Sequence, residues 1–291
     1  MDMLHVDGVE HRWVDIGPFH MHVAEAGAGE PLLLLHGWPQ HWYEWRYVIG
    51  PLAEHYRVIC PDLRGFGWSD APPGPYDKET LAHDIVRLLD ALELDRVRLI
   101  GHDWGGFVGF LLCLLHPERF ERFLALNIIH PWQRPSLRSL ANAWRPAHAY
   151  LISTPGVGGW VLRNQPSFVR TALQLGTHDR SVWTEQDLAA FAEPLREPAR
   201  AAATVALYRT FVTREARAML AGRYRSMRLT TPTLMLFGKR DRAISTSALE
   251  GFEPYADDMR VQLVPDAGHF IAEEKPALVV ERALTFFSKA G

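Results

Sequence analysis

The chain has 291 residues, of which 47% are apolar and 22% charged, and 31 basic against 34 acidic side chains give a formal net charge of −3. This composition is typical of a folded globular protein and excludes disordered, collagen-like and coiled-coil chains. The near balance of charge argues against a nucleic-acid partner and against binding to an anionic membrane. The acidic N-terminus has no apolar segment of the kind that signal peptides carry, so we expect a cytoplasmic protein.

The first hundred residues alternate between two patterns. Short apolar runs bounded by Gly and Pro predict strands, and amphipathic or wholly apolar stretches between them predict helices. This alternation is typical of an α/β fold with a mostly parallel sheet flanked by helices. The predicted strands are His20–Ala24, Leu32–Leu35, Val58–Cys60 and Arg98–Ile100, and the predicted helices are Thr80–Leu92 and Phe107–Leu115.

The pattern changes at about Trp132, where strand-like runs stop and helical patterns follow one another. Strands return at Thr233–Phe237 and Val261–Val264, and a last amphipathic helix spans Pro276–Phe287. We therefore predict one α/β core, residues 1–131 and 223–291, interrupted by a helical cap at residues 132–222. The helices predicted within the cap are 137–149, 157–163, 166–175, 185–191 and 200–214.

A predicted strand runs directly into the sequence Gly-His-Asp-Trp-Gly at residues 101–105, and a helix follows. Glycines on both sides of a central residue permit the sharp strand-to-helix turn that lifts a nucleophile above the sheet edge. The central residue here is Asp103. A carboxylate is ionised at neutral pH and attacks an sp³ carbon that bears a leaving group, forming an ester. Hydrolysis of that ester then requires a base.

Three loops after other predicted strands complete the site. His269 lies in a Gly-bounded loop and is expected to be the general base, with Asp241 orienting its ring. His36-Gly-Trp-Pro39 follows the strand Leu32–Leu35, where α/β hydrolases place an oxyanion donor. The expected donors are the backbone N–H groups of Trp38 and Trp104. His36 is expected to fix the loop, and no metal or cofactor is required.

With these motifs in hand, the chain resembles the α/β-hydrolase superfamily over nearly its whole length, and in particular its epoxide hydrolase and haloalkane dehalogenase branch. The matching segments are HGWP at 36–39, DLRGFGWS at 62–69, GHDWGG at 101–106 and DAGHF at 266–270. Epoxide hydrolases carry an aromatic residue in the third place of H-G-x-P, and Trp38 fits. Many dehalogenases carry an Asn there to hold halide, which this chain lacks.

The resemblance also implies residues in the cap. Ala206–Phe211 is similar to the segment whose tyrosine protonates the opening epoxide, which makes Tyr208 the expected proton donor. Tyr150 precedes Pro155-Gly156 as a second such tyrosine would, although its register is off by about one residue. Gln40 stands where the family often has an acid, and we expect it to position the attacking water without taking a proton.

Epoxide hydrolysis to a vicinal diol is the favoured activity, with a small hydrophobic epoxide and water as substrates. The alternative is a haloalkane dehalogenase, in which the Trp104 indole would hold the halide together with Trp38, Trp132 or Trp183. A non-catalytic binding protein is a third interpretation, and the retained Asp, Asp and His argue against it. Monomer and homodimer both remain open. Tryptophans at 132, 144, 160 and 183 predict an apolar roof over the site.

Overall fold

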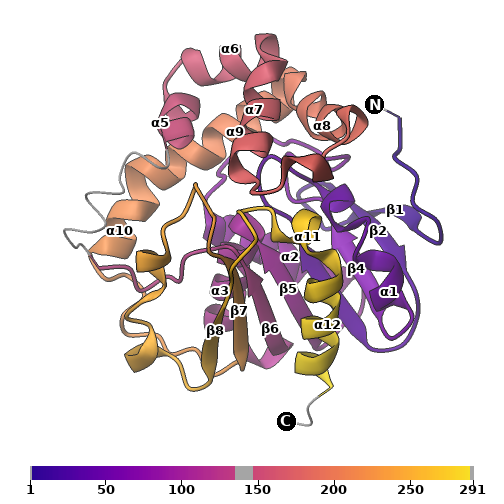
Figure 1. Ribbon diagram of the computed structural model, residues 1–291, viewed down its shortest axis with the longest axis vertical. Helices are drawn as coiled ribbons and strands as arrows, with labels where there is room; N and C mark the ends of the chain where they lie inside the picture. The colour runs from indigo at the N-terminus through magenta and orange to yellow at the C-terminus, as the bar shows by residue number, and fades with distance from the viewer. Residues whose placement is uncertain (1, 135–146, 289–291) are drawn as a thin grey trace.

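The fold is organised around one eight-stranded sheet (Figure 1), and the computed structural model describes residues 2–134 and 147–288. The strand order is β1-β2-β4-β3-β5-β6-β7-β8. Pairs β1–β2 and β2–β4 are antiparallel, and all later pairs are parallel. The strands are β1 (Glu10–Asp15), β2 (His20–Ala26), β3 (Pro31–Leu35), β4 (Arg57–Pro61), β5 (Val97–His102), β6 (Phe120–Leu126), β7 (Thr233–Gly238) and β8 (Met259–Val264).

Helices cover both faces of this sheet. Side chains of β3 show the reason, because Leu33 and Leu35 belong to one buried cluster while Leu32 and Leu34 belong to another. A strand with apolar residues on both faces has to be covered on both. Helices α2 and α3 pack on the first face, and α1 and α12 on the second. The core helices are α1 (Ile49–Ala53), α2 (Lys78–Ala91), α3 (Asp103–Leu115), α11 (Ile271–Glu274) and α12 (Pro276–Phe287).

Between β6 and β7 the described chain is helical, and residues 147–220 are called the helical insert below. Figure 1 shows the insert lying above one end of the sheet. Its two ends connect to β6 and β7, which are neighbours in the sheet. Its helices are α5 (Ala147–Ser153), α6 (Val157–Asn164), α7 (Pro166–Gly176), α8 (Glu185–Ala192), α9 (Pro198–Thr210) and α10 (Ala216–Leu220), with a π-helical turn, Phe211–Glu215, between the last two.

The predicted fold class, a mostly parallel sheet flanked by helices, is confirmed. Two strands, β1 and β6, escaped prediction, and a single helix over 200–214 proved to be α9 followed by the π-helical turn. The cap boundaries at 132 and 222 stay a prediction, and the helical insert lies inside them. Trp144 and most of the predicted helix 137–149 fall outside the described residues. Among the described helices, none has the length and apolar character needed to cross a membrane.

Candidate active site

Asp103 occupies the turn between β5 and α3 with a positive φ of 45°. L-residues rarely adopt this left-handed conformation, and its occurrence here fits a tight elbow. The turn also depends on Gly105, because a Cβ there would lie 2.2 Å from the Leu35 carbonyl oxygen. At Gly101 a Cβ would lie 2.6 Å from the Gly105 carbonyl oxygen. The two glycines let α3 begin directly against the end of β3.

The loop after β3 holds one oxygen of the Asp103 carboxylate. The backbone N–H of Trp38 donates to Asp103 Oδ2 at 3.0 Å. The other oxygen, Oδ1, lies 3.7 Å from His269 Nε2. Trp104 is in the first turn of α3, where backbone N–H groups lack intrahelical partners. The peptide between Trp38 and Pro39 is cis. The hydrogen bond from Trp38 and the approach of His269 orient the Asp103 carboxylate, with one oxygen bound and the other facing the imidazole.

His269 and Asp241 come together from the loops after β8 and β7. His269 Nδ1 lies 2.8 Å from Asp241 Oδ2, and both side chains are buried. Asn127, directly after β6, donates from Nδ2 to the same Asp241 oxygen at 2.8 Å and to the Gly268 carbonyl at 3.1 Å. Asp241 Oδ1 accepts the backbone N–H groups of residues 243 and 244. Asn127 therefore joins the two loops, a contact that no sequence motif indicated.

The charges of this group shape its titration. Burial alone would lower the pKa of His269, but the carboxylates of Asp241 and Asp103 raise this pKa to about 9. Burial would raise the pKa of Asp241, yet the charge and hydrogen bond of His269 bring it below its usual value. The imidazole is thus protonated at neutral pH, and the Asp241 carboxylate beside it is ionised. Loss of the charge on Asp103 would remove one of the causes that keep His269 protonated.

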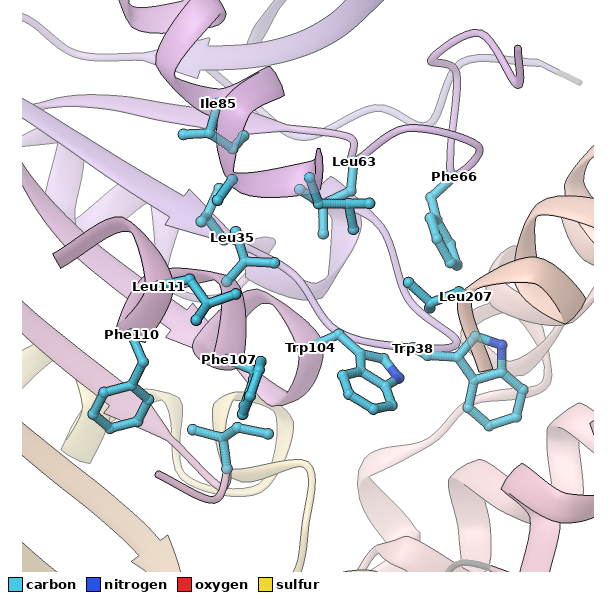
Figure 2. Close-up of a cluster of buried hydrophobic side chains, with 14 of the residues drawn as sticks. Leu35, Trp38, Leu63, Phe66, Ile85, Trp104, Phe107, Phe110, Leu111 and Leu207 are labelled. Carbon is cyan, nitrogen blue, oxygen red and sulfur yellow. The ribbon is translucent and has the colours of Figure 1, made fainter. Parts of the chain in front are cut away.

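Aromatic rings from the core and the helical insert face Asp103. Tyr208 of α9 is 2% exposed, and its ring contacts Trp38 and Trp104 edge-to-face at centroid distances of 5.3 and 5.6 Å. Figure 2 shows both tryptophans at the end of the buried cluster nearest the insert. Burial and the Asp103 carboxylate raise the pKa of Tyr208 well above its ordinary value. The phenol is therefore a protonated donor at neutral pH.

In the helical insert, the ring that packs on Trp38 and Tyr208 is that of His148, whereas Tyr150 was the expected residue. The Tyr150 side chain is 50% exposed on α5. His148, two residues earlier, stacks on Trp38 at 5.5 Å and contacts Tyr208 edge-to-face at 5.6 Å. Positions two apart on a helix point in nearly opposite directions, so only one of them can face the site. Burial lowers the pKa of His148 to about 4, which leaves its ring neutral.

His36 and Gln40 lie on either side of the Trp38 loop. The His36 ring accepts the Leu63 N–H at Nε2 and lies 3.0 Å from the Gly37 carbonyl oxygen through Nδ1, so it joins the Trp38 loop to the loop after β4. Gln40 is buried and donates from Nε2 to Glu273 Oε1 at 2.8 Å. Its Oε1 has no hydrogen-bond partner among the described residues. An acceptor of this kind can bind a water.

A buried pair behind the site was also missed. His102 Nδ1 lies 2.7 Å from Glu44 Oε1, and His102 Nε2 lies 2.9 Å from the His269 carbonyl oxygen. Glu44 also accepts the Gly37 N–H at 3.1 Å. Burial would lower the pKa of His102, but Glu44 raises it. The pair connects the Trp38 loop, the elbow and the His269 loop. Its only signal in the sequence is a lone acid in the aromatic-rich segment His41–Trp45.

The tryptophans of the predicted roof differ in role. The indole of Trp132 donates to the Tyr224 carbonyl and that of Trp183 to Thr177 Oγ1, so neither donor is available to a ligand. Trp160 is exposed. The indole N–H groups of Trp38 and Trp104 are buried without a hydrogen-bond partner in the described part of the chain.

Comparison with known proteins places this geometry in a family. A family model described as the alpha/beta hydrolase fold matches residues 30–276, most of the chain. The chain belongs to the α/β-hydrolase fold family. It is therefore an enzyme of that superfamily, built on the sheet and elbow described above.

This α/β-hydrolase has relatives that match it nearly end to end. It is 32% identical to the "Soluble epoxide hydrolase" of Corynebacterium sp. (strain C12), over 96% of this chain and 98% of the relative. It is also 32% identical to the "AB hydrolase superfamily protein YfhM" of Bacillus subtilis (strain 168), over 97% and 99%. Among solved structures it resembles the epoxide hydrolase CorEH without ligand, with a TM-score of 0.87, 31% identity and coverage of 96% and 99%.

Proposed function

We propose that this α/β-hydrolase opens epoxides to vicinal diols through an ester on Asp103. The observation that carries the proposal is Tyr208, a buried phenol packed on the two tryptophans beside the nucleophile. An alkoxide leaving a strained ring is strongly basic and needs a proton, and a phenol can supply it. Relatives named as epoxide hydrolases at about 30% identity support the same chemistry.

In the first half-reaction Asp103 attacks a ring carbon. The Trp38 N–H holds Oδ2, which leaves Oδ1 as the attacking oxygen. A C–O bond forms to Oδ1 while the ring C–O bond breaks, and the ring oxygen takes the proton of Tyr208. We propose that the neutral His148 ring, beside Tyr208, donates a second hydrogen bond to that oxygen. The product of this step is a hydroxyalkyl ester of Asp103.

The second half-reaction hydrolyses the ester. Once Asp103 has lost its charge, the pKa of His269 falls, and its proton can restore the phenol of Tyr208. Neutral His269 then takes a proton from a water molecule held by Gln40, and the resulting hydroxide adds to the carbonyl carbon of the Asp103 ester. The N–H groups of Trp38 and Trp104 hold the oxyanion. Collapse expels the diol alkoxide, which takes the proton of the newly formed Asp103 carboxyl group, and the starting charges are restored.

We further propose that the helical insert acts as the cap of this site. It contributes Tyr208 and His148, and the rings around them are apolar or uncharged. Burial of a charged substrate against such a wall would be unfavourable. The proposed substrate is therefore a small uncharged epoxide with an apolar substituent.

The test uses His269→Gln, which keeps the nucleophile and removes the base. We expect intact mass after exposure to an epoxide to increase by the whole mass of the substrate, because the ester forms and is not hydrolysed. The matched control is the double variant with Asp103→Asn, in which the adduct should be absent. Absence of an adduct over a broad epoxide panel would overturn the proposal, and an adduct that survives Asp103→Asn would show that another residue is the nucleophile.

One observation favours a second candidate, the haloalkane dehalogenase. The buried indole N–H groups of Trp38 and Trp104 have no partner in the described ranges, and indole N–H groups are suitable donors to a halide. The same His269→Gln variant separates the two activities. A bromoalkane adduct carries the substrate mass less HBr and needs no proton donor. Tyr208→Phe should therefore abolish the epoxide adduct and spare a bromoalkane adduct.

A further inference from the structure

A lysine is buried beside the nucleophile elbow. Lys78 is the first residue of α2, and its side chain is 0% exposed. Lysine is almost never fully buried without a partner, and the dipole at a helix N-terminus opposes a cation. The residue therefore depends on compensating contacts, and these contacts show which parts of the molecule it joins.

Its polar contacts are with the helical insert. Lys78 Nζ donates to the Leu207 carbonyl at 2.9 Å and to Glu215 Oε2 at 2.9 Å. The backbone N–H of Lys78 donates to the other oxygen of Glu215 at 2.8 Å. Leu207 lies in the last turns of α9, one residue before Tyr208. A buried ion pair thus fastens the start of a core helix to the segment that carries the proposed proton donor.

Its apolar contacts are with the elbow. The ammonium lies 4.3 Å from the centroid of the Trp104 ring and 5.1 Å from that of Phe211, within cation–π range. Phe211 also packs edge-to-face on Trp104 at 4.8 Å. Trp104 follows the nucleophile and contacts Tyr208. One side chain therefore touches both the residue after Asp103 and the residue before Tyr208.

The π-helical turn ends at Glu215, the partner of this lysine. It begins at Phe211, whose N–H donates to the carbonyl groups of Leu207 and Tyr208. π-Helical turns are rare in proteins, and those that occur are often found at functional sites. The Leu207 carbonyl consequently carries two donors, one from its own helix and one from Lys78. These two hydrogen bonds to one carbonyl restrain the turn of α9 from which Tyr208 projects.

We propose that Lys78, paired with Glu215, is a positioning residue for ring opening that sets Tyr208 against Asp103 through the Leu207 carbonyl and the Trp104 ring. The inference rests on the proposed function, in which Tyr208 protonates the epoxide oxygen. Tyr208 gives its proton only in the first half-reaction. Loss of Lys78 is therefore expected to slow ester formation and to leave ester hydrolysis nearly unchanged, a split that general destabilisation would not produce.

The test compares three variants. Lys78→Met removes the cation but leaves the Glu215 carboxylate unpaired, so the double variant Lys78→Met/Glu215→Gln removes both charges and protects the fold. Glu215→Gln alone keeps the bond from Lys78 to Leu207 and should have a smaller effect. Single-turnover quench with intact-mass detection measures both half-reactions. We expect the first two variants to form the ester about 10- to 100-fold more slowly, with hydrolysis within about 3-fold of the parent.

The matched control is Arg223→Gln. Arg223 pairs with Glu79, the neighbour of Lys78, and joins α2 to the residues after α10, but this pair is on the surface and touches neither Trp104 nor Leu207. In Arg223→Gln, ester formation and ester hydrolysis should both keep the rates of the parent enzyme. Parent-like ester formation in the double variant, or equal slowing of both steps, would overturn the inference. Failure of the proposed function has a different signature, namely no epoxide adduct in His269→Gln itself.

Discussion

The Gln40 amide donates to a carboxyl group that has an unusual titration. Glu273 Oε1 accepts from Gln40 and from Arg46 Nη1, each at 2.8 Å, and the Glu273 side chain is buried. Burial raises the pKa of Glu273 to about 7, although Arg46 acts to lower it. An acid at position 40, which the family often has, would here face a second carboxyl group. The glutamine is thus matched to Glu273 as well as to the proposed water.

Gln40→Glu is expected to destabilise the fold, and more at pH 8 than at pH 6. Glu273 loses its proton as the pH rises through about 7, so two buried carboxylates meet only at the higher pH. Leaving the buried Glu273 carboxylate without the Gln40 donor costs about 1–3 kcal/mol of unfolding free energy. Urea unfolding at pH 6 and pH 8 measures this loss of stability. Gln40→Leu, which removes the donor without adding charge, is the control, and an equal pH dependence in both variants would contradict the argument.

The residues proposed to react could be predicted for a local reason. Asp103, Asp241 and His269 each follow a buried strand of a parallel sheet, where the carboxyl ends of the strands meet. His148 could not be separated from Tyr150, because the choice depends on the rotation of a short helix, which a shift of one residue changes by about 100°. The pairing of Glu44 with His102 could not be predicted from the sequence, since it brings together loops from three strands.

At the scale of elements, the loop that carries His269 is bound to the helical insert as well as to the sheet. The His269 N–H donates to the Gly176 carbonyl at 2.8 Å. Glu274 bridges the same junction, because its Oε1 accepts the Gly268 N–H at 2.8 Å. Its Oε2 accepts the N–H groups of residues 178 and 179, both at 3.0 Å. The position of His269 thus depends on how the helical insert packs against this loop.

Glu274→Ala is expected to slow ester hydrolysis by about 10-fold and to change ester formation little, because in the proposed mechanism His269 acts as the base only in the second step. Ester should accumulate in the steady state, which quench and intact mass detect. Glu185→Ala breaks the exposed Arg170–Glu185 pair within the insert and serves as the control. If Glu274→Ala slowed ester formation as much as hydrolysis, the junction would have a general structural role only.

Each element that was not predicted lacks a clear local signal in the sequence. The edge strand β1, Glu10–Asp15, is largely exposed and has no apolar run. Strand β6 begins at Phe120 and carries Glu121 and Arg122 at its next two positions, and Glu121 pairs with Arg98 of the neighbouring strand, a tertiary contact that no local pattern shows. The π-helical turn continues directly from α9, and the helical pattern in the sequence does not mark where one ends and the other begins. Strands β3, β4 and β7, by contrast, were recognised from their continuous apolar runs.

At the scale of the whole molecule, buried histidines set the response to pH. Burial lowers the pKa of His41, His130 and His148 to about 4, so these rings are neutral in the fold. His269 behaves in the opposite way, with its pKa raised to about 9. Between about pH 4 and pH 6.5, the first three histidines bind more protons in the unfolded chain than in the folded protein. Between about pH 6.5 and pH 9, His269 binds fewer protons in the unfolded chain than in the folded protein.

The free energy of unfolding is therefore expected to be largest near pH 6.5. It falls on acidification because three histidines take up protons on unfolding, against one proton released by Glu273, whose pKa is raised to about 7. It falls on alkalinisation because His269 loses the proton that Asp241 and Asp103 stabilise. Urea unfolding from pH 4 to 9 checks the curve. His269→Gln should flatten only the alkaline side, and an unchanged alkaline slope would contradict this account.

The contacts between the helical insert and the core limit how the two can be recombined. Because β6 and β7 are adjacent, the insert could be cut out and another grafted in without changing the register of the sheet. Such a graft would nevertheless leave Lys78 without Glu215 and would take Asp187 away from Arg46. A chimaera that keeps its stability has to move these ion pairs with the insert. In laboratory or natural recombination, the unit of exchange is thus the insert together with the core residues that pair with it.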